Sequence, residues 1–554
     1  MERVLFIVPP YSDYEGFVNP AFNDSRMMKK SGEYKRLVTD MPIGLLSMSA
    51  YIKKHTDVEV ALLDFNIVLN EMETFTYDSF VDMFQNVLSR GDWFAFNPTV
   101  VGISALFTPV YYNMLDVANV AHRVFPDALI IAGGAAPTNM FGEIYRDTSC
   151  FDALCYGEAE KPLLALLEAK ERQENVKEFL EGHPSWITRK KAEDGASFKH
   201  DFIDDLDEIP FYDYGLLNLA KNNMSPSLNS FTDFNAAKNV FFMATSRGCP
   251  HHCCFCASHS VHGWKMRYHS AERVKEDLTR LSAEHAADTI FFQDDHIMAD
   301  KERFLRILES IKSLGLKVLF QNGLAIYALD RNVLEAIKDA GINHIVLSVE
   351  SGSERVLKKI MHKPLDLSMV RRVTAECREL RIDTDINILI GLPGETKEDI
   401  EETREFLKTL YPSWFRIYTA APLVGSEMYN ICVKNGYLKG SHIGTGWKKS
   451  VIETPQFTAD YIQQKVYALN LELNFVLNSD LRLGRYEKAL EAFQHVIRIK
   501  SDHALAHYFA AQSCKGLGRD EEFTHHATQY AEIVNESAFW RSYANEFNLQ
   551  PLAS

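Results

Sequence analysis

Four of the nine cysteines in this 554-residue chain lie within one stretch, SRGCPHHCCFCAS, at residues 246–258. These four are Cys249, Cys253, Cys254 and Cys256. Clustered thiolates are ligands for soft metals, and nine cysteines are too few for a disulfide scaffold in a chain of this length. The cluster therefore predicts a metal site in a reducing compartment.

A zinc site is one possible use of these thiols. Structural zinc sites take four ligands, commonly as two separated pairs. No second cysteine pair follows here, because Cys377 and Cys432 each stand alone. A zinc site completed by His251, His252 or His259 remains an alternative.

The elements that position this cluster are predicted from two series of apolar, β-branched runs. These runs alternate with helical patterns. The first has strand candidates at 4–8, 58–64, 100–104 and 128–133 and a helix over 42–53 that begins with proline. The second has strand candidates at 240–244, 289–293, 317–322, 344–348, 385–390 and 416–420. Such alternation predicts parallel sheets with ligands at the carboxyl ends of the strands. The cysteines directly follow the first strand of the second series, so we expect function in these loops.

The predicted fold class is α/β, in several parts. We expect a Rossmann-like parallel-sheet domain over 1–190, a polar connector over 191–238, a partial (β/α)6 TIM-type barrel over 239–430 and an all-helical region over 431–554. In the last region LGRYEKAL (483–490) recurs as LGRDEEFT (517–524), an offset of 34 residues. That period is typical of the tetratricopeptide repeat (TPR), which we expect over about 466–535. A generic helical cap is the alternative.

Composition excludes several other classes of protein. Lys and Arg number 59 and Asp and Glu 75, a net charge of −16, which argues against extended nucleic-acid binding. The longest apolar stretches fall short of the ~20 residues of a membrane span. The N-terminus, MERVLFIVPP, is typical of a first strand and not of a signal peptide. We therefore expect a cytoplasmic protein without a membrane span.

The spacing Cys249-x3-Cys253-x2-Cys256, with Phe255 before the third cysteine, resembles the signature of the radical S-adenosylmethionine (SAM) enzymes. This resemblance implies that the three cysteines hold three irons of a 4Fe–4S cluster and that SAM takes the fourth iron. It also implies cleavage of SAM to a 5′-deoxyadenosyl radical, with electrons from a flavodoxin- or ferredoxin-like donor. Cys254 is then a packed or spare thiol.

The resemblance extends over about 240–430 and implies further SAM contacts after the successive strands. They are Phe255, Asp294, Asp295, Ser348, Glu350, Ser351, Gly391 and Pro393. The chain departs from the family at FFQDDHIM (291–298), where the usual Gly-Gly-Glu is absent. Asp294 and Asp295 could instead simply end a strand.

Residues 1–190 resemble the cobalamin-binding domain that precedes the radical SAM barrel in one large subfamily. The resemblance implies cobalamin contacts at Pro10, Gly44, Leu45, Ser104, Leu106, Gly133, Gly134 and Glu158. The Asp-x-His-x-x-Gly motif, whose histidine ligates cobalt in other cobalamin enzymes, is absent from the sequence. Cobalamin would therefore bind without a protein histidine on cobalt. A domain that keeps the fold without the cofactor is the alternative.

Together these resemblances imply a cobalamin-dependent methyltransferase that acts on an unactivated carbon of a small-molecule or lipid-like substrate. A cyclase, oxidation or carbon–carbon coupling enzyme, acting on a porphyrin- or lipid-type substrate, is the alternative. Methylthiolation of tRNA is disfavoured, because it would call for a second three-cysteine set and the first domain has only Cys150 and Cys155.

The substrate itself is not evident from the sequence, but three positions after the last barrel strand are candidates for contacting it: Tyr418, Pro422 and Gly425. Residues 12–40 form either a lid over the cofactor or a solvated loop. The TPR-like tail offers a surface for a protein partner.

Overall fold

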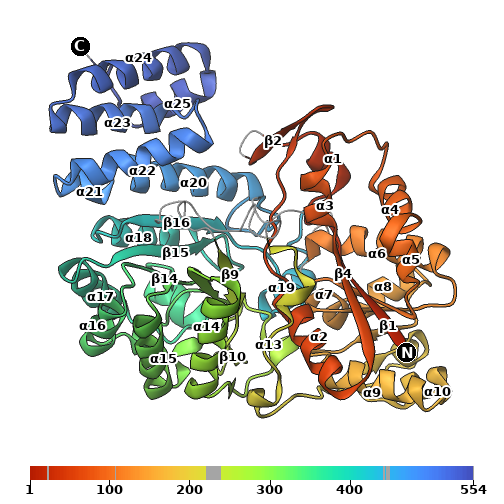
Figure 1. Cartoon of the computed structure of the whole chain (residues 1–554). Coiled ribbons are helices and arrows are strands. Elements are labelled where there is room, and N and C mark those ends of the chain that lie inside the picture. Colours follow the sequence, from red (N-terminus) through yellow and green to blue (C-terminus); the bar gives the residue numbers. More distant parts are fainter. Residues whose placement is uncertain (22–23, 107, 220–238, 441–442, 444–448, 553–554) are drawn as a thin grey trace. The chain divides into compact units, whose positions relative to one another are not determined.

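The computed structural model describes residues 1–21, 24–106, 108–219, 239–440, 443 and 449–552 (Figure 1). Two compact units are distinguished by their internal contacts. Unit 1 comprises Met1–Ser227, Lys238–Ser310 and Pro422–Gly446, and unit 2 comprises Leu228–Ala237, Ile311–Ala421 and Trp447–Ser554. Across the described ranges, every helix is too short or too polar to cross a membrane.

Unit 1 begins with a six-stranded sheet in the order β4-β1-β5-β6-β7-β8. Its strands are β1 (Glu2–Val8), β4 (Val58–Asp64), β5 (Val100–Ser104), β6 (Leu129–Gly133), β7 (Ala153–Cys155) and β8 (Trp186–Ile187). The first five run parallel, and β8 is antiparallel to β7. The predicted strands at 58–64 and 100–104 are confirmed. The connection reverses direction between β1 and β5, and α/β sheets bind ligands at such a switch point.

Helices cover both faces of this sheet. Val4 and Phe6 face α2 (Ile43–His55), α9 (Glu160–Glu171) and α10 (Val176–Gly182) in one apolar core. Leu5 and Ile7 belong to the opposite core, with α3 (Phe65–Glu71), α4 (Phe80–Leu88), α6 (Tyr111–Val124) and α8 (Phe141–Asp147). Successive side chains of a strand point to opposite faces, so a continuous apolar run such as 4–8 fits a sheet buried on both sides. The shorter helices here are α5 (Gly91–Phe96), α7 (Ala135–Asn139) and α11 (Arg189–Glu193).

The segment predicted as a lid or a solvated loop contains α1 (Tyr14–Val18) and a hairpin of β2 (Arg26–Lys29) and β3 (Gly32–Lys35) (Figure 1). Phe17 and Tyr34 lie in an aromatic cluster with Phe75. The ammonium of Lys29 donates to the carbonyls of Leu69, at 2.8 Å, and of Asn70 and Met72 near the end of α3. The described part of this segment is thus anchored to its own domain, and a lid function stays a prediction.

The second series of strands begins in unit 1. β9 (Val240–Met243) and β12 (Thr289–Phe292) pair in parallel, and β10 (Ser246–Arg247) and β11 (Arg267–Tyr268) form a short antiparallel ribbon. The helices of this part are α13 (His259–His262), α14 (Ala271–His285), α15 (Lys301–Leu314) and α19 (Glu427–Asn435).

Unit 2 holds the remaining strands and most of the C-terminal helices. β14 (His344–Glu350), β15 (Asp383–Ile390) and β16 (Trp414–Thr419) form a parallel sheet in that order, and β13 (Lys317–Phe320) precedes them. The helices between them are α16 (Arg331–Asp339), α17 (Leu367–Glu379) and α18 (Lys397–Lys408). The strand positions predicted at 344–348, 385–390 and 416–420 are confirmed to within two residues.

The tail is helical, as predicted. It consists of α20 (Ala459–Leu471), a π-helical turn η8 (Glu472–Val476), α21 (Ser479–Arg482), α22 (Tyr486–Ile499), α23 (Ala504–Leu517), α24 (Asp520–Glu536) and α25 (Ala538–Glu546), drawn in blue in Figure 1. Both copies of the 34-residue repeat adopt the same local structure. Gly484 and Gly518 are left-handed, with φ of 70° and 69°, and α22 and α24 begin two residues after them. The protein is therefore mixed α/β, with parallel sheets and a helical C-terminal region.

Candidate active site

The β10–β11 ribbon closes the loop that carries the cysteines. Arg247 pairs with Arg267 across the ribbon, and residues 248–266 lie between them. Inside the loop the amide of Cys249 donates to the Gly263 carbonyl at 3.4 Å, and that of Cys256 donates to the Cys253 carbonyl at 3.0 Å. The loop is therefore folded upon itself by the protein's own hydrogen bonds.

The four sulfurs of the loop lie in two kinds of surroundings. Cys249, Cys253 and Cys256 are half-buried, whereas Cys254 is only 3 % exposed. Burial raises the pKa of the Cys254 thiol to about 12. The Cys254 carbonyl accepts a hydrogen bond of 2.8 Å from the amide of Met428, in α19. This division supports the predicted ligand set, with Cys254 as a packed thiol.

A 4Fe–4S cluster fits this donor set, because each cysteine of such a cluster holds a different iron and none of the described cysteines is in a disulfide. The amide of Ser258 donates to the Cys256 sulfur at 3.5 Å, and hydrogen bonds to the sulfurs tune such clusters. Within the described ranges, no three His, Cys, Asp or Glu side chains lie close enough together to bind a single metal ion.

The two adjacent acids after β12 have different environments. Asp294 is buried, and its Oδ1 accepts from the Thr245 amide at 3.0 Å, the Thr245 hydroxyl at 2.7 Å and the Ser246 hydroxyl at 2.6 Å. Burial raises its pKa. Asp295 is exposed and accepts a hydrogen bond from the hydroxyl of Ser258, two residues after Cys256. Asp294 thus ties β12 to the end of β9, and Asp295 faces the cysteine loop.

In unit 2, the SAM contacts predicted after the strand at 344–348 lie at the end of β14, where the backbone is strained. Glu350 has φ of +72°, at a register shift between β14 and β15. Burial raises the pKa of its carboxyl, and the Lys363 ammonium lies 3.5 Å away. Such strain in a residue other than glycine persists at functional sites. Ser351 is fully buried, and its hydroxyl shares a 3.1 Å hydrogen bond with that of Thr403. The Ser348 hydroxyl donates to the Asn322 carbonyl at 3.3 Å.

The predicted turn after β15 is organised by a residue outside the predicted set. Glu395 is fully buried, and its Oε2 accepts from the amides of Gly391, at 2.6 Å, and Leu392, at 3.1 Å. Burial raises its pKa to about 8. Gly391 has φ of +96°, and a Cβ there would lie 2.8 Å from Ile462 in α20. Pro393 in the same turn is buried.

Four of the eight residues predicted to contact cobalamin lie at the ends of β5 and β6. Ser104 and Gly133 are paired in register, and the Ala105 amide donates to the Gly133 carbonyl at 2.9 Å. Gly134 has φ of +112°, and a Cβ there would lie 2.5 Å from the Ala105 carbonyl oxygen. Leu106 is 47 % exposed despite its apolar side chain. The exposed apolar side chain of Leu106, next to the switch point, fits a large cofactor that is partly apolar, whereas the space beside Gly134 is taken by the Ala105 carbonyl.

The other residues of that set are more scattered. The Pro10 carbonyl accepts from the Asn113 side-chain amide at 2.8 Å, beside the switch point. Gly44 lies in the first turn of α2, and a Cβ built there would have no other atom within 4 Å. Leu45, next to it, packs into the core against the sheet.

Glu158 has a role that sequence reasoning missed. Its Oε2 accepts from Arg247, at 2.9 Å, and from Arg267, at 2.8 Å. Its Oε1 accepts from Arg267 at 2.5 Å and lies 2.8 Å from His262 Nδ1. Burial opposes ionisation, but these groups outweigh it and hold the pKa of Glu158 well below its usual range. The available signal was Arg247, directly before Gly248 and Cys249. A contact of Glu158 with cobalamin stays a prediction.

The three candidate substrate residues fall in different parts of the molecule. Tyr418, on β16 in unit 2, is 48 % exposed. Pro422 is buried in unit 1. Gly425, also in unit 1, has φ of +94° and is so close to Asn139 that a Cβ would lie 2.5 Å from its Oδ1. Their role towards a substrate stays a prediction.

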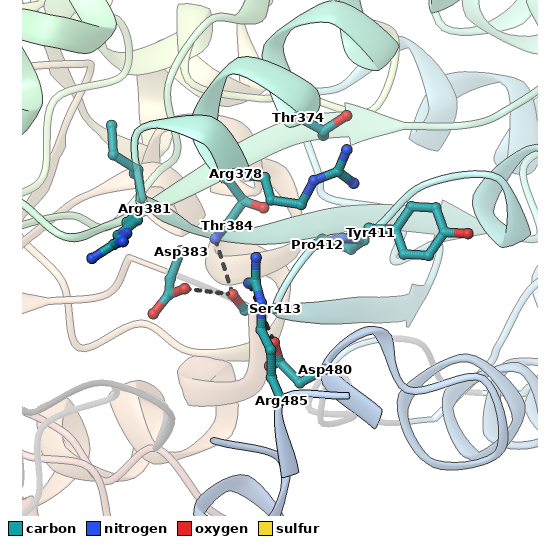
Figure 2. A pocket seen from close by; sticks show the side chains of 11 residues that line it. Thr374, Arg378, Arg381, Asp383, Thr384, Tyr411, Pro412, Ser413, Asp480 and Arg485 are labelled. Atoms are coloured by element: carbon teal, nitrogen blue, oxygen red, sulfur yellow. Dashed lines mark hydrogen bonds and ion pairs between the residues drawn. The ribbon is translucent and has the colours of Figure 1, made fainter. Parts of the chain in front are cut away.

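A small pocket in unit 2 lies away from these loops (Figure 2). It is at the amino ends of β15 and β16, where the Thr384 amide donates to the Ser413 hydroxyl at 3.3 Å. Figure 2 shows Arg378 and Arg381 pointing in different directions and Arg485 approaching Asp480, at 3.6 Å. The guanidinium groups therefore do not converge on one anion.

Comparison with known proteins finds a match for the region with the cysteine loop and a second match for the N-terminal sheet domain. Residues 243–407 match the Radical SAM superfamily, and residues 39–167 match the B12 binding domain. The cytidylyl-2-hydroxyethylphosphonate methyltransferase of Streptomyces wedmorensis is 26 % identical over 385 residues, which cover 65 % of this chain and 72 % of that protein. An uncharacterized methyltransferase of Pyrococcus horikoshii is 26 % identical over 449 residues, covering 78 % and 87 %.

A solved structure shares the fold over almost the whole chain. It is that of the cobalamin-dependent S-adenosylmethionine radical enzyme OxsB with aqua-cobalamin and S-adenosylmethionine bound. The TM-score is 0.62 at 14 % identity, covering 99 % of this chain and 80 % of that one. The protein therefore carries a B12-binding domain and a radical SAM domain, and it is a radical SAM enzyme whose cofactors are a 4Fe–4S cluster, S-adenosylmethionine and cobalamin.

Proposed function

We propose that this enzyme methylates an unactivated carbon of a small-molecule or lipid-like substrate. The observation that carries the proposal is that the cysteine loop and the B12-binding domain belong to one compact unit. Ser260, in α13 of that loop, accepts a 2.8 Å hydrogen bond from Asn139 at the end of α7. When bound, the cluster supplies the electron that cleaves SAM to a 5′-deoxyadenosyl radical, and cobalamin supplies the methyl group.

The chain's own residues bind and orient these groups. Cys249, Cys253 and Cys256 hold the cluster. Asp295, whose carboxylate is exposed on the side of the cysteine loop, takes the amino group of SAM, while Asp294 is a buried tie between strands.

The SAM contacts predicted after the later strands of the second series belong to the same proposal. Glu350 and Ser348 meet the ribose and methionine portions of SAM. The backbone at Gly391 and Pro393 meets its adenine and is held in shape by Glu395. Ser351 belongs to the same predicted segment, and its hydroxyl also supports the turn through Thr403.

The finer architecture is part of the same proposal. The strands from β9 to β16 would form the partial barrel, and the helices over about 466–535 would be TPR-like, since both repeat copies lie at equivalent helix junctions. The electron donor would be flavodoxin- or ferredoxin-like. A cytoplasmic location is part of the same proposal, because four of the nine cysteines cluster in one predicted metal-binding loop, as suits a reducing compartment.

Anaerobic reconstitution with iron, sulfide and cobalamin, followed by mass spectrometry of the SAM products, tests the reaction type. We expect 5′-deoxyadenosine together with S-adenosylhomocysteine, and the second product should require cobalamin. Cys253→Ala should form no 5′-deoxyadenosine, which controls for cluster-independent SAM breakdown. Deoxyadenosine without S-adenosylhomocysteine, at any cobalamin content, would overturn methyl transfer and favour the cyclase or coupling reaction.

A further inference from the structure

The ribbon that closes the cysteine loop places two arginines in register. Arg247 and Arg267 are opposite each other across β10 and β11, and both residues are buried, at 9 % and 2 % exposure. Like charges directly opposite on neighbouring strands destabilise the pair, and burial increases the cost. The ribbon can close only if a counter-charge reaches both guanidinium groups.

That counter-charge comes from the B12-binding domain. Glu158 is 5 % exposed and bridges the two arginines through both carboxylate oxygens. Glu160 takes the other nitrogen of Arg247 at 2.6 Å, and the Ser47 hydroxyl in α2 accepts from the same nitrogen at 3.0 Å. The two glutamates balance the two arginines, and the carboxylate of Glu158 is the group that the arginines share.

The turn before Glu158 has a conformation that holds the Glu158 side chain beside the two arginines. Gly157 has φ of +80°, and a Cβ there would overlap the imidazole of His200. His200 stacks on Tyr156 and on Phe202, with ring centroids 4.6 Å apart in each pair. The guanidinium of Arg267 lies 4.1 Å from the centre of the Phe202 ring. Arg267 also donates to the carbonyls of Ile203, at 3.0 Å, and His262, at 3.1 Å.

We propose that Glu158 is a positioning residue that sets the conformation of the cysteine loop from the B12-binding domain. Its carboxylate neutralises Arg247 and Arg267 and so closes the loop of residues 248–266 before any cluster is present. The arrangement of the cluster ligands then depends on a turn of the domain that binds the other cofactor. This inference rests on the assignment of the cluster to the three cysteines and not on methyl transfer.

Hydrogen–deuterium exchange on the full-length apo chain tests the loop directly. Glu158→Gln keeps the size of the side chain but leaves the two buried arginines short of one negative charge. We expect amides of residues 246–268 to exchange at least about tenfold faster than in the wild type, a change that 1.4 kcal/mol produces. β5 and β6 should exchange as in the wild type. Glu178→Gln, an exposed glutamate in α10, is the matched control and should change neither region. Unchanged exchange over 246–268 in Glu158→Gln would overturn the proposal.

Charge balance separates positioning from a general loss of structure. Glu158→Gln combined with Arg267→Gln removes one charge of each sign, and we expect it to slow loop exchange relative to Glu158→Gln alone. Glu158→Asp, which keeps the charge, should also lie nearer the wild type. If Glu158→Gln does not fold, recovery of the folded chain becomes the readout: the double variant and Glu158→Asp should fold, and their failure to fold would contradict the proposal. A double variant whose loop exchanges as fast as that of Glu158→Gln, or faster, would contradict the role assigned to the charge.

The reconstituted enzyme gives a second readout. We expect Glu158→Gln to lose its cluster to an iron chelator at least about tenfold faster than the wild type, again a 1.4 kcal/mol effect. Cobalamin content, measured on the same samples, should stay as in the wild type. A variant that lost cobalamin but kept its cluster would overturn the proposal in favour of a direct cobalamin contact. If the wild type bound no cluster, the proposed function would fail, while exchange in the apo chain would still test the loop.

Discussion

Cys253 and Cys254 are neighbours in the chain, but their thiols lie in different surroundings. Cys253 is half-buried on the cysteine loop, whereas Cys254 is buried and its backbone carbonyl anchors Met428 of α19. Burial in apolar surroundings raises the thiol pKa and makes the metal-binding thiolate less accessible. Asp294 and Asp295 show the same division between a buried structural side chain and an exposed one.

We expect Cys254→Ala to keep a full cluster and Cys253→Ala to lose it. The buried Cys254 packs like a small apolar residue, so its truncation should cost about 1 kcal/mol of stability through the cavity that is left. Iron and sulfide content after anaerobic reconstitution measures the outcome. A full cluster in Cys253→Ala together with a depleted one in Cys254→Ala would reverse the ligand assignment.

Glu395 makes the stability of its turn depend on pH. Its pKa is raised by burial from an ordinary 4.5 to about 8 in the folded protein. Between these values the folded chain holds a proton that the unfolded chain releases. Stability therefore falls as pH rises through this range.

We expect Glu395→Gln to remove this part of the pH dependence, because its amide oxygen can accept the two backbone hydrogen bonds without a charge. The variant should gain thermal stability over the wild type as pH rises from about 5 to about 8.5, by a few kcal/mol at most. Thermal unfolding at both pH values measures the difference in stability between the variant and the wild type. The exposed Glu402→Gln on α18 is the control, and an equal gap at both pH values would contradict the prediction.

At the scale of elements, the helical tail covers the edge of the sheet in unit 2. Asn474 in η8 accepts from the Phe415 amide at 2.8 Å and donates to the Phe415 carbonyl at 2.8 Å. Asn470, one turn earlier in α20, donates to the Ile417 carbonyl at 2.9 Å. These side chains satisfy backbone groups that an edge strand otherwise exposes for aggregation. The tail is therefore part of the folded core of unit 2.

We expect Asn474→Ala to destabilise the protein by about 1–3 kcal/mol, because it leaves the buried backbone groups of Phe415 without partners. It should also promote aggregation through the freed edge of β16. Thermal unfolding and light scattering measure the two effects. Asn545→Ala, at an exposed position of α25, should leave both unchanged, and equal behaviour of the two variants would count against this role of Asn474.

At the scale of the whole molecule, charge limits the partners. The net charge of −16 is unfavourable for contact with a polyanion, which requires a surface that displaces phosphate counterions. Many of the basic side chains are paired with acidic ones, including Arg247, Arg267 and Arg416. A small substrate makes no such demand.

We therefore expect no complex with tRNA at about 0.15 M salt, where the screening length is about 8 Å. A gel-shift titration of the full chain measures this, with a basic RNA-binding protein as the positive control. A shift that weakens steadily as salt is added would reveal a basic surface and would contradict the prediction.

Much of the fold was predictable because its signals are local. The nearly continuous apolar run at 100–104 gave β5 at its observed bounds, since a strand buried on both faces is largely apolar. β4 was also predicted at its bounds of 58–64, from its Val, Ala and Leu residues, although Glu59 in it is exposed. The two-residue strands β8, β10 and β11 were missed, because so short a segment carries no periodicity. The hairpin of β2 and β3 was missed because the polar residues of 26–35 resemble a loop.

The sequence by itself predicted which cofactor chemistry this protein supports: three cysteines at a fixed spacing, directly after a strand, are the predicted cluster ligands and lie within eight residues of one loop. Tertiary structure alone decided which neighbouring groups are available for that chemistry. Burial separates Cys254 from Cys253 and Asp294 from Asp295, although each pair is adjacent in the chain. Glu158 and Arg247 are 89 residues apart, and no local pattern can pair them. Folding joins them because two buried arginines require a shared carboxylate.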